Sequence, residues 1–179
     1  MATAVPNTRK KLLTGLFAES DTADHAYQVC VDRGYDVGDI NVVVSEGTRK
    51  KLLAAKEQTK SKLADRKTEG GELGGPSGGR VGLLVTIFAA VGAAVAIPAI
   101  GFAAGPIVVA LTAAGAAGVA GGLIAALGNW GIPDKRTREY EAAIKKGEIL
   151  MMVEPRSEAD RRAIEAAWRK LGGRDVQYG

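Results

Sequence analysis

The chain has 179 residues, a formal net charge of +4 and a single cysteine. This length allows one ordinary domain with an insertion, or two small domains. Because Cys30 has no partner in the chain, an intrachain disulfide is excluded and an oxidising compartment gains no support, which favours the cytoplasmic side of a membrane.

Residues 1–47 predict a strand, a helix and a second strand. The apolar run at 12–18 has strand character and is too short for a signal peptide. A helix start is expected at Ser20 or Asp21, and Gly34 is expected to end the helix. Its apolar residues follow the spacing of one buried helical face, and a second strand is expected over 40–45. This segment is the first βαβ half of the predicted domain.

Residues 48–80 predict a basic helical arm that ends in a glycine-rich hinge. Two interpretations of the arm stay open, a solvated helix or a contact with anionic lipid headgroups. The expected headgroup contacts lie on both sides of the apolar stretch: Lys50, Lys51, Lys56, Lys60, Lys62, Arg66, Lys67, Arg80, Lys135, Arg136, Arg138 and Trp130. The hinge glycines resemble a phosphate loop, but Arg80 and Val81 stand where Lys and Ser or Thr would be needed.

Residues 81–130 belong to a stretch with no charged side chain and predict an apolar helical hairpin. The expected helices run over 81–97 and 107–130, each close to the length that crosses a bilayer. Prolines remove backbone donors and glycines permit a reversal of the chain, so the hairpin turn is expected at Pro98, Gly101, Gly105 and Pro106.

Small residues recur every four positions in the two predicted helices, as in a glycine zipper. Such stripes let helix backbones approach closely. Two small faces on one helix imply two neighbours, one of which is a second copy of the chain. The predicted self-association residues are Gly78, Gly82, Ala110, Ala114, Gly118, Gly121 and Gly122. The hairpin is therefore expected either in a membrane or in the dry centre of a soluble homo-oligomer.

Residues 131–179 repeat the pattern of the first half. A helix over 134–146 leads to a strand over 148–153, Ser157 begins another helix, and a last strand is expected near 174–178. The predicted fold class is α+β. Two βαβ units combine most simply into a ferredoxin-like sandwich, a four-stranded antiparallel sheet with helices on one face, and the hairpin is an insertion between them.

The sequence offers no catalytic constellation. His25 is expected at the surface and Cys30 in the core, and no group of residues has metal-ligand spacing. We therefore expect no enzymatic activity, cofactor, metal or small-molecule substrate. The predicted strands lack the aromatic cluster that reads RNA, so nucleic acid is disfavoured as a partner.

Several motifs together resemble the bacterial general-stress-protein-like family with a central glycine-zipper hairpin. They are Leu16-Phe-Ala, Ile40-Asn-Val-Val, the hairpin itself, Gly131-Ile-Pro-Asp, Tyr140-Glu and Gly147-Glu-Ile-Leu. The resemblance implies a link to heat, cold or general stress, membrane association and no known catalytic residues. The long basic arm departs from that family, so its role does not carry over.

The sequence thus predicts a non-enzymatic stress-associated protein that self-assembles through its hairpin and supports the inner membrane, with the folded domain in the cytoplasm. The expected partners are other copies of the chain and anionic lipids. Two alternatives stay open: a soluble cytoplasmic homo-oligomer that buries the hairpins, and a small regulatory binding module.

Overall fold

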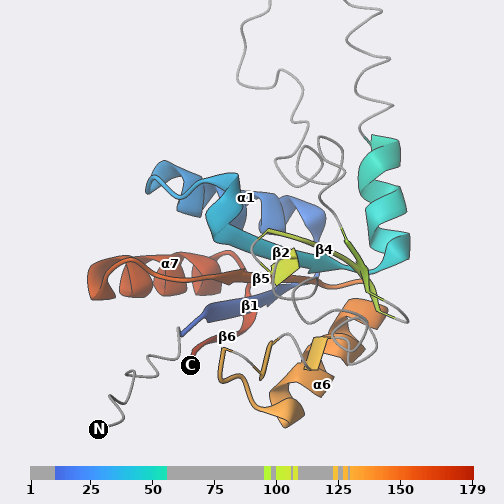
Figure 1. Ribbon diagram of the computed structural model, residues 1–179. Coiled ribbons are helices and arrows are strands. Elements are labelled where there is room, and N and C mark those ends of the chain that lie inside the picture. The colour runs from blue at the N-terminus through green and yellow to red at the C-terminus, as the bar shows by residue number, and fades with distance from the viewer. Residues whose placement is uncertain are drawn as a thin grey trace, which may run out of the picture.

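Six antiparallel strands form one sheet in the computed structural model (Figure 1). The structure describes residues 11–55, 95–97, 100–105, 107–108, 123–124, 127–128 and 130–179. The strands lie in the order β3-β4-β2-β5-β1-β6. Their bounds are β1 Leu13–Phe17, β2 Ile40–Val44, β3 Val95–Ile97, β4 Gly101–Ala104, β5 Ile149–Val153 and β6 Arg174–Tyr178.

Two βαβ units from opposite ends of the chain interlock in this sheet. Helix α1 (Ser20–Asp32) joins β1 to β2, and helix α7 (Glu158–Lys170) joins β5 to β6. Strand β5 lies between β2 and β1, so a strand of the second unit pairs with both strands of the first. The predicted α+β architecture of two βαβ units in an antiparallel sheet is confirmed.

The first face of the sheet is covered by α1 and α7, the helices of the two units. Their apolar residues pack on alternate residues of the central strands, for example Leu13 and Phe17 of β1. Trp168 of α7 is fully buried, its indole N–H donates to the carbonyl of Ala26 at 3.0 Å, and its ring meets that of Phe17 edge-on at 5.7 Å. These contacts join both helices to β1.

The second face is also covered, which corrects the expectation of helices on one face only. Helix α6 (Asp134–Lys145) packs on it through Tyr140, Ala143 and Ile144. Apolar residues of the uncharged stretch lie beside α6 in the same cluster: Ile100, Ala103, Ile107, Leu123, Leu127 and Ile132. Because β1, β2 and β5 are buried at every position, their second set of side chains needs this layer.

Strands β3 and β4 replace part of the predicted helical hairpin. We expected a helix through Ile97 and a turn over 98–106, but 95–97 and 101–104 are strands, and β4 pairs with β2. Gly101 and Gly105 lie where β4 approaches β2 most closely. A Cβ at Gly101 would overlap the carbonyl of Val44, and one at Gly105 that of Ile40. Pro98 and Pro106 lie outside the described residues.

A further helix over residues 46–55 follows β2 directly. Ser45 caps its first turn, where the Ser45 hydroxyl accepts the backbone N–H of Thr48 at 3.1 Å, and Leu52 reaches the first-face cluster. This helix is the described part of the predicted basic arm. None of the helices in the described ranges combines the length and the hydropathy that a bilayer crossing requires.

Candidate functional site

The predicted self-association residues cannot be placed. Gly78, Gly82, Ala110, Ala114, Gly118, Gly121 and Gly122 all lie outside the described residues. The same holds for six of the predicted headgroup contacts: Lys56, Lys60, Lys62, Arg66, Lys67 and Arg80. The glycine-zipper interface therefore stays a prediction.

The other predicted headgroup contacts differ in exposure. Lys50 and Lys51 are exposed on helix 46–55, and Lys135 and Arg138 are exposed on α6. Arg136 is half-buried. Trp130 is also half-buried, and it packs against the second-face cluster.

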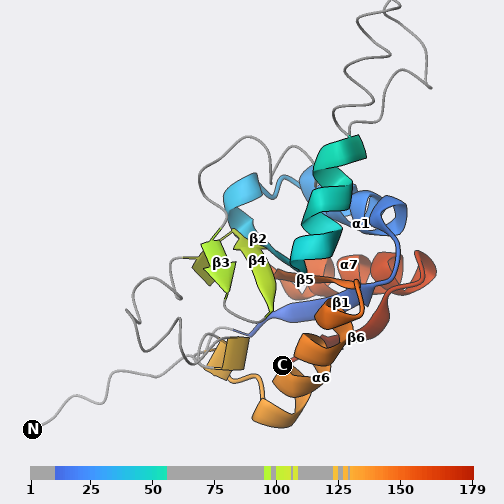
Figure 2. The same cartoon turned by 90° about the vertical axis from the view of Figure 1, so that its right-hand side faces the viewer.

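Two pairs of lysines that are distant in sequence lie on two helix ends that meet at one end of the sheet. The hydroxyl of Thr48 donates to the carbonyl of Gly147 at 3.1 Å, and this bond holds the start of helix 46–55 against the end of α6. Lys50 and Lys51 follow Thr48, while Lys145 and Lys146 precede Gly147, and all four are exposed. We call this surface, made of Lys50, Lys51, Lys145 and Lys146, the lysine end. Figure 2 shows the backbone of helix 46–55 and of α6, which carry it, on the side that faces the viewer.

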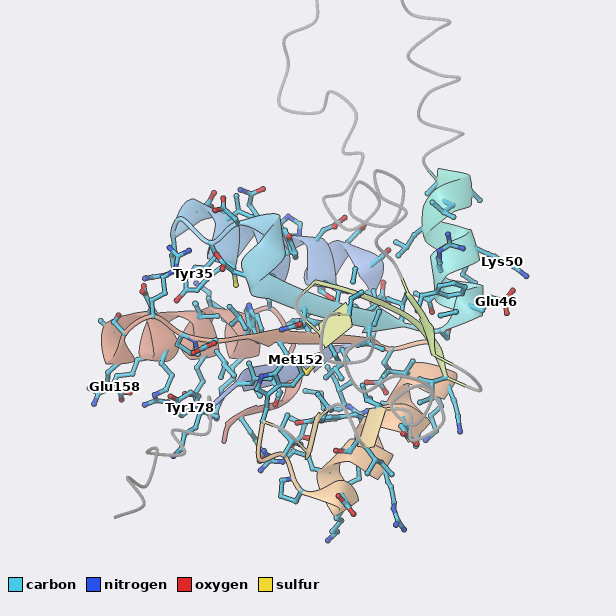
Figure 3. The ribbon with its side chains drawn as sticks, viewed as in Figure 1. Tyr35, Glu46, Lys50, Met152, Glu158 and Tyr178 are labelled. Carbon is cyan, nitrogen blue, oxygen red and sulfur yellow. The ribbon has the colours of Figure 1, made fainter. Side chains whose placement is uncertain are left out.

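Acidic residues offset only part of the charge at the lysine end. Within the described part of the chain, Lys50 is the one of these four lysines that pairs with a carboxylate, that of Glu46 at 2.7 Å. Both side chains point away from the sheet (Figure 3). The hydrogen bond from Lys50 lowers the pKa of the Glu46 carboxyl, which keeps it ionised. The nearby carboxylate of Glu148 is bound to Arg174 at 2.5 Å.

Lys145 and Lys146 are not among the predicted headgroup contacts. Both lie at the end of a predicted helix, where cations are common for a local reason, since they stabilise the helix dipole. Their meeting with Lys50 and Lys51 depends on the pairing of β2 with β5, which brings residue 48 to residue 147. The one available signal was the Lys-Lys-Gly run itself.

A buried asparagine fixes the return of the uncharged stretch to the sheet. Asn41 of β2 is 2% exposed, and its side-chain oxygen accepts the backbone N–H of Ile107 at 2.5 Å. Its amide nitrogen lies 3.4 Å from the carbonyl of Met152 on β5. A buried polar side chain on a sheet face requires such partners. Asn41 therefore anchors residue 107 to the two central strands.

A cavity of about 320 Å³ lies at the opposite end of the sheet. Its lining comes from four stretches of the chain: Leu12, then Tyr35, Asp39 and Asn41, then Trp130, and last Glu154, Pro155 and Arg156. Arg156 stacks on the ring of Tyr35 at 4.5 Å, donates to the carbonyl of Gly34 at 2.8 Å and pairs with Asp39 at 2.7 Å. The guanidinium of Arg156 thus links the loop after β5 to the segment before β2.

The described residues hold no reactive centre. Burial raises the pKa of the Cys30 thiol to about 12, so it is protonated and unreactive at neutral pH. His25 is exposed, and its Nδ1 lies 2.7 Å from the carbonyl of Asp21. No group of three or more potential metal ligands occurs in the part of the chain that was described. The expectation that the protein is not an enzyme stays a prediction.

Comparisons with known proteins supply no further assignment: no family model, curated protein or solved structure matches this chain.

Proposed function

We propose that this chain is a non-enzymatic, self-assembling protein of the inner membrane, whose ferredoxin-like domain holds the apolar insert in place. The strand order β2-β5-β1-β6, built from two βαβ units, supports the ferredoxin-like assignment. Strands β3 and β4 then extend that four-stranded unit at the β2 edge. A role under stress is supported only by the motifs that resemble the glycine-zipper stress family.

The observation that carries the proposal is the attachment of the uncharged stretch to the domain at two points. Ile107 is held by Asn41, and Leu123 and Leu127 are buried against the second face of the sheet. Between these points the sequence has an uncharged run in which Ala and Gly recur every four residues. We propose that this run contacts the same run of another copy, as small-residue stripes do between helices in lipid.

The test is the oligomer mass of the full chain in a membrane-mimicking detergent. Gly118→Leu with Gly122→Leu adds two bulky side chains to the proposed interface, and we expect the oligomer to dissociate to smaller species. The matched control is Gly128→Leu, at an exposed position with open space around it. An oligomer of unchanged mass in the double variant contradicts the zipper interface.

A second candidate is a soluble oligomer that buries its inserts. The burial of Ile100, Ala103 and Leu127 against the chain's own sheet favours it, because these apolar residues are already withdrawn from solvent without lipid. Carbonate extraction of membranes from expressing cells separates the two candidates. A protein that stays in the membrane pellet supports the membrane proposal, and full release into the supernatant supports the soluble oligomer.

A further inference from the structure

We infer that the lysine end is the surface through which the folded domain docks on a bilayer that carries anionic phosphate headgroups. This inference rests on the proposed membrane function and adds the orientation of the domain, with the start of β5 and the end of β2 toward the lipid. Lys145 and Lys146 are the new residues in this assignment.

Exposed charge is unevenly distributed over the domain. Residues 46–55 and 134–146 expose six basic and three acidic side chains. Residues 19–36, which include α1, expose four acidic side chains and one basic side chain. A surface of anionic lipid attracts the first region and repels the second, so charge disfavours an orientation with α1 toward the lipid.

Lys51, Lys145 and Lys146 pair with no carboxylate among the described residues and are available to an external anion, while Lys50 pairs with Glu46. The bond between Thr48 and Gly147 fixes the two helix ends that carry them, so the lysines are presented together without a folding cost on binding. Arg49, next to Lys50 in the chain, is half-buried, and its guanidinium lies 4.4 Å from the ring of Phe102 on β4. The sequence continues beyond residue 55 with Lys56, Lys60 and Lys62, so more basic residues follow in the chain.

Among the described residues no exposed aromatic ring lies at this end, where Phe102 is half-buried with Arg49 over its ring, and this favours lipid over single-stranded nucleic acid. Proteins that bind single strands stack bases on exposed aromatic rings beside a basic surface. Among the described residues the exposed large hydrophobic side chain is Tyr178, which pairs with Leu13. Leu13 lies opposite Val153, at the other end of β5 from Ile149, so Tyr178 is remote from the lysine end.

The direct test is flotation of the full chain with vesicles of phosphatidylcholine alone or mixed with phosphatidylglycerol. We expect binding to the anionic vesicles only, with an affinity that falls as salt is raised. Lys145→Gln with Lys146→Gln removes two charges of about 1 kcal/mol each, which corresponds to a loss of about 30-fold in affinity. The matched control, Arg162→Gln with Lys170→Gln, removes two exposed charges from α7 and should bind within about twofold of the unchanged chain.

Three results overturn the docking surface: equal binding to the two vesicle types, equal losses in the two double variants, or a loss of RNA binding in a gel shift while vesicle binding persists. Oligomer mass in detergent is measured on the same variants and should not change. If the oligomer and its carbonate resistance persist while the lysine substitutions leave flotation unaltered, the docking surface is wrong and the proposed function stands. If the oligomer is absent from the unchanged chain, the proposed function fails whatever the lysines do.

Discussion

The two faces of the sheet are closed in different ways. On the first face, α1 and α7 each cover the strands that they connect, so the layer is made of residues next to those strands in the sequence. On the second face, α6 is joined by residues of the uncharged stretch that lie far from the central strands in the sequence. The first layer follows from local pattern, and the second depends on the tertiary fold.

This difference changes the meaning of the uncharged stretch. An uninterrupted apolar run is compatible with a segment that spans a bilayer. It is equally compatible with a segment that packs on a sheet whose strands are apolar on both faces. In β5, Leu150 and Met152 point to the second face, while Ile149, Met151 and Val153 point to the first (Figure 3 marks Met152). A part of the stretch therefore serves the domain, and the zipper proposal concerns the rest.

The largest expected effect is on the first face. Trp168→Ala removes a fully buried indole, its hydrogen bond to Ala26 and its edge contact with Phe17, so we expect a loss of about 3–5 kcal/mol in the free energy of unfolding. Urea unfolding followed by circular dichroism measures it. Ala166→Ser, at an exposed position of the same helix, should change the free energy by less than about 0.5 kcal/mol. A small loss for Trp168→Ala would mean that α7 does not hold the first face.

The matching change on the second face is Leu127→Ala. Leu127 is 0% exposed, so its truncation should cost about 2–5 kcal/mol if the uncharged stretch stabilises the domain. The control is Gly128→Ala, which is exposed and has open space around it. An unchanged unfolding curve for Leu127→Ala would show that the stretch belongs to a separate structure, and the comparison of the faces would fail.

A smaller effect is expected where β4 joins β2. Gly105 has a φ of 96°, and a Cβ there would overlap the carbonyl of Ile40, so Gly105→Ala should cost about 1–3 kcal/mol. Gly38→Ala is the control, because no atom lies within 4 Å of a Cβ at that position. Equal thermal unfolding of the two variants would contradict the close pairing of β4 with β2.

The elements of the first face could be predicted because each carries a local signal. Ser157 was expected to begin a helix, and its hydroxyl accepts the backbone N–H of Asp160 at 3.0 Å. Ala23, Ala26, Tyr27 and Cys30 follow helical spacing and are all buried on α1. The strand bounds at 40–44 and 149–153 agree with the apolar runs in the sequence.

The cover of the second face and the place of Lys145 and Lys146 beside the helix of Lys50 and Lys51 were not predicted, for related reasons. The runs Ile40-Asn-Val-Val-Val and Ile149-Leu-Met-Met-Val do not alternate, which indicates burial on both faces, but that signal does not say which residues supply the second cover. Gly101 and Gly105 were assigned to a helix turn because glycine permits reversal; the close approach to β2 is visible only in the fold. Lys145 and Lys146 likewise lie near the helix of Lys50 and Lys51 only because β2 pairs with β5 in the sheet.

The smallest predicted effect is on the first turn of α7. Helices α7 and α6 cover opposite faces of the sheet, and their first turns are stabilised in different ways. Helix α7 has a side-chain cap from Ser157, and hydrogen bonds from Arg161 and Arg162 lower the pKa of Glu158 to about 2. Helix α6 begins at Asp134, and its N-cap residue Pro133 provides no side-chain cap. Acid should therefore loosen α7 through the loss of the ion pairs of Glu158.

The sign follows from the lowered pKa. Because the folded state favours the ionised carboxylate, the contribution of Glu158 is complete above the ordinary value of 4.5 and is lost as the pH falls toward 2. Glu158 is exposed, so solvent and salt screen its ion pairs and the loss is small. Urea unfolding at pH 7 and pH 3 should show a slightly steeper acid loss for the unchanged chain than for Glu158→Gln, and raised salt should narrow the gap. Parallel pH profiles would mean that the Ser157 cap and first-face packing hold α7 without this carboxylate, and the two helices would then depend on packing alike.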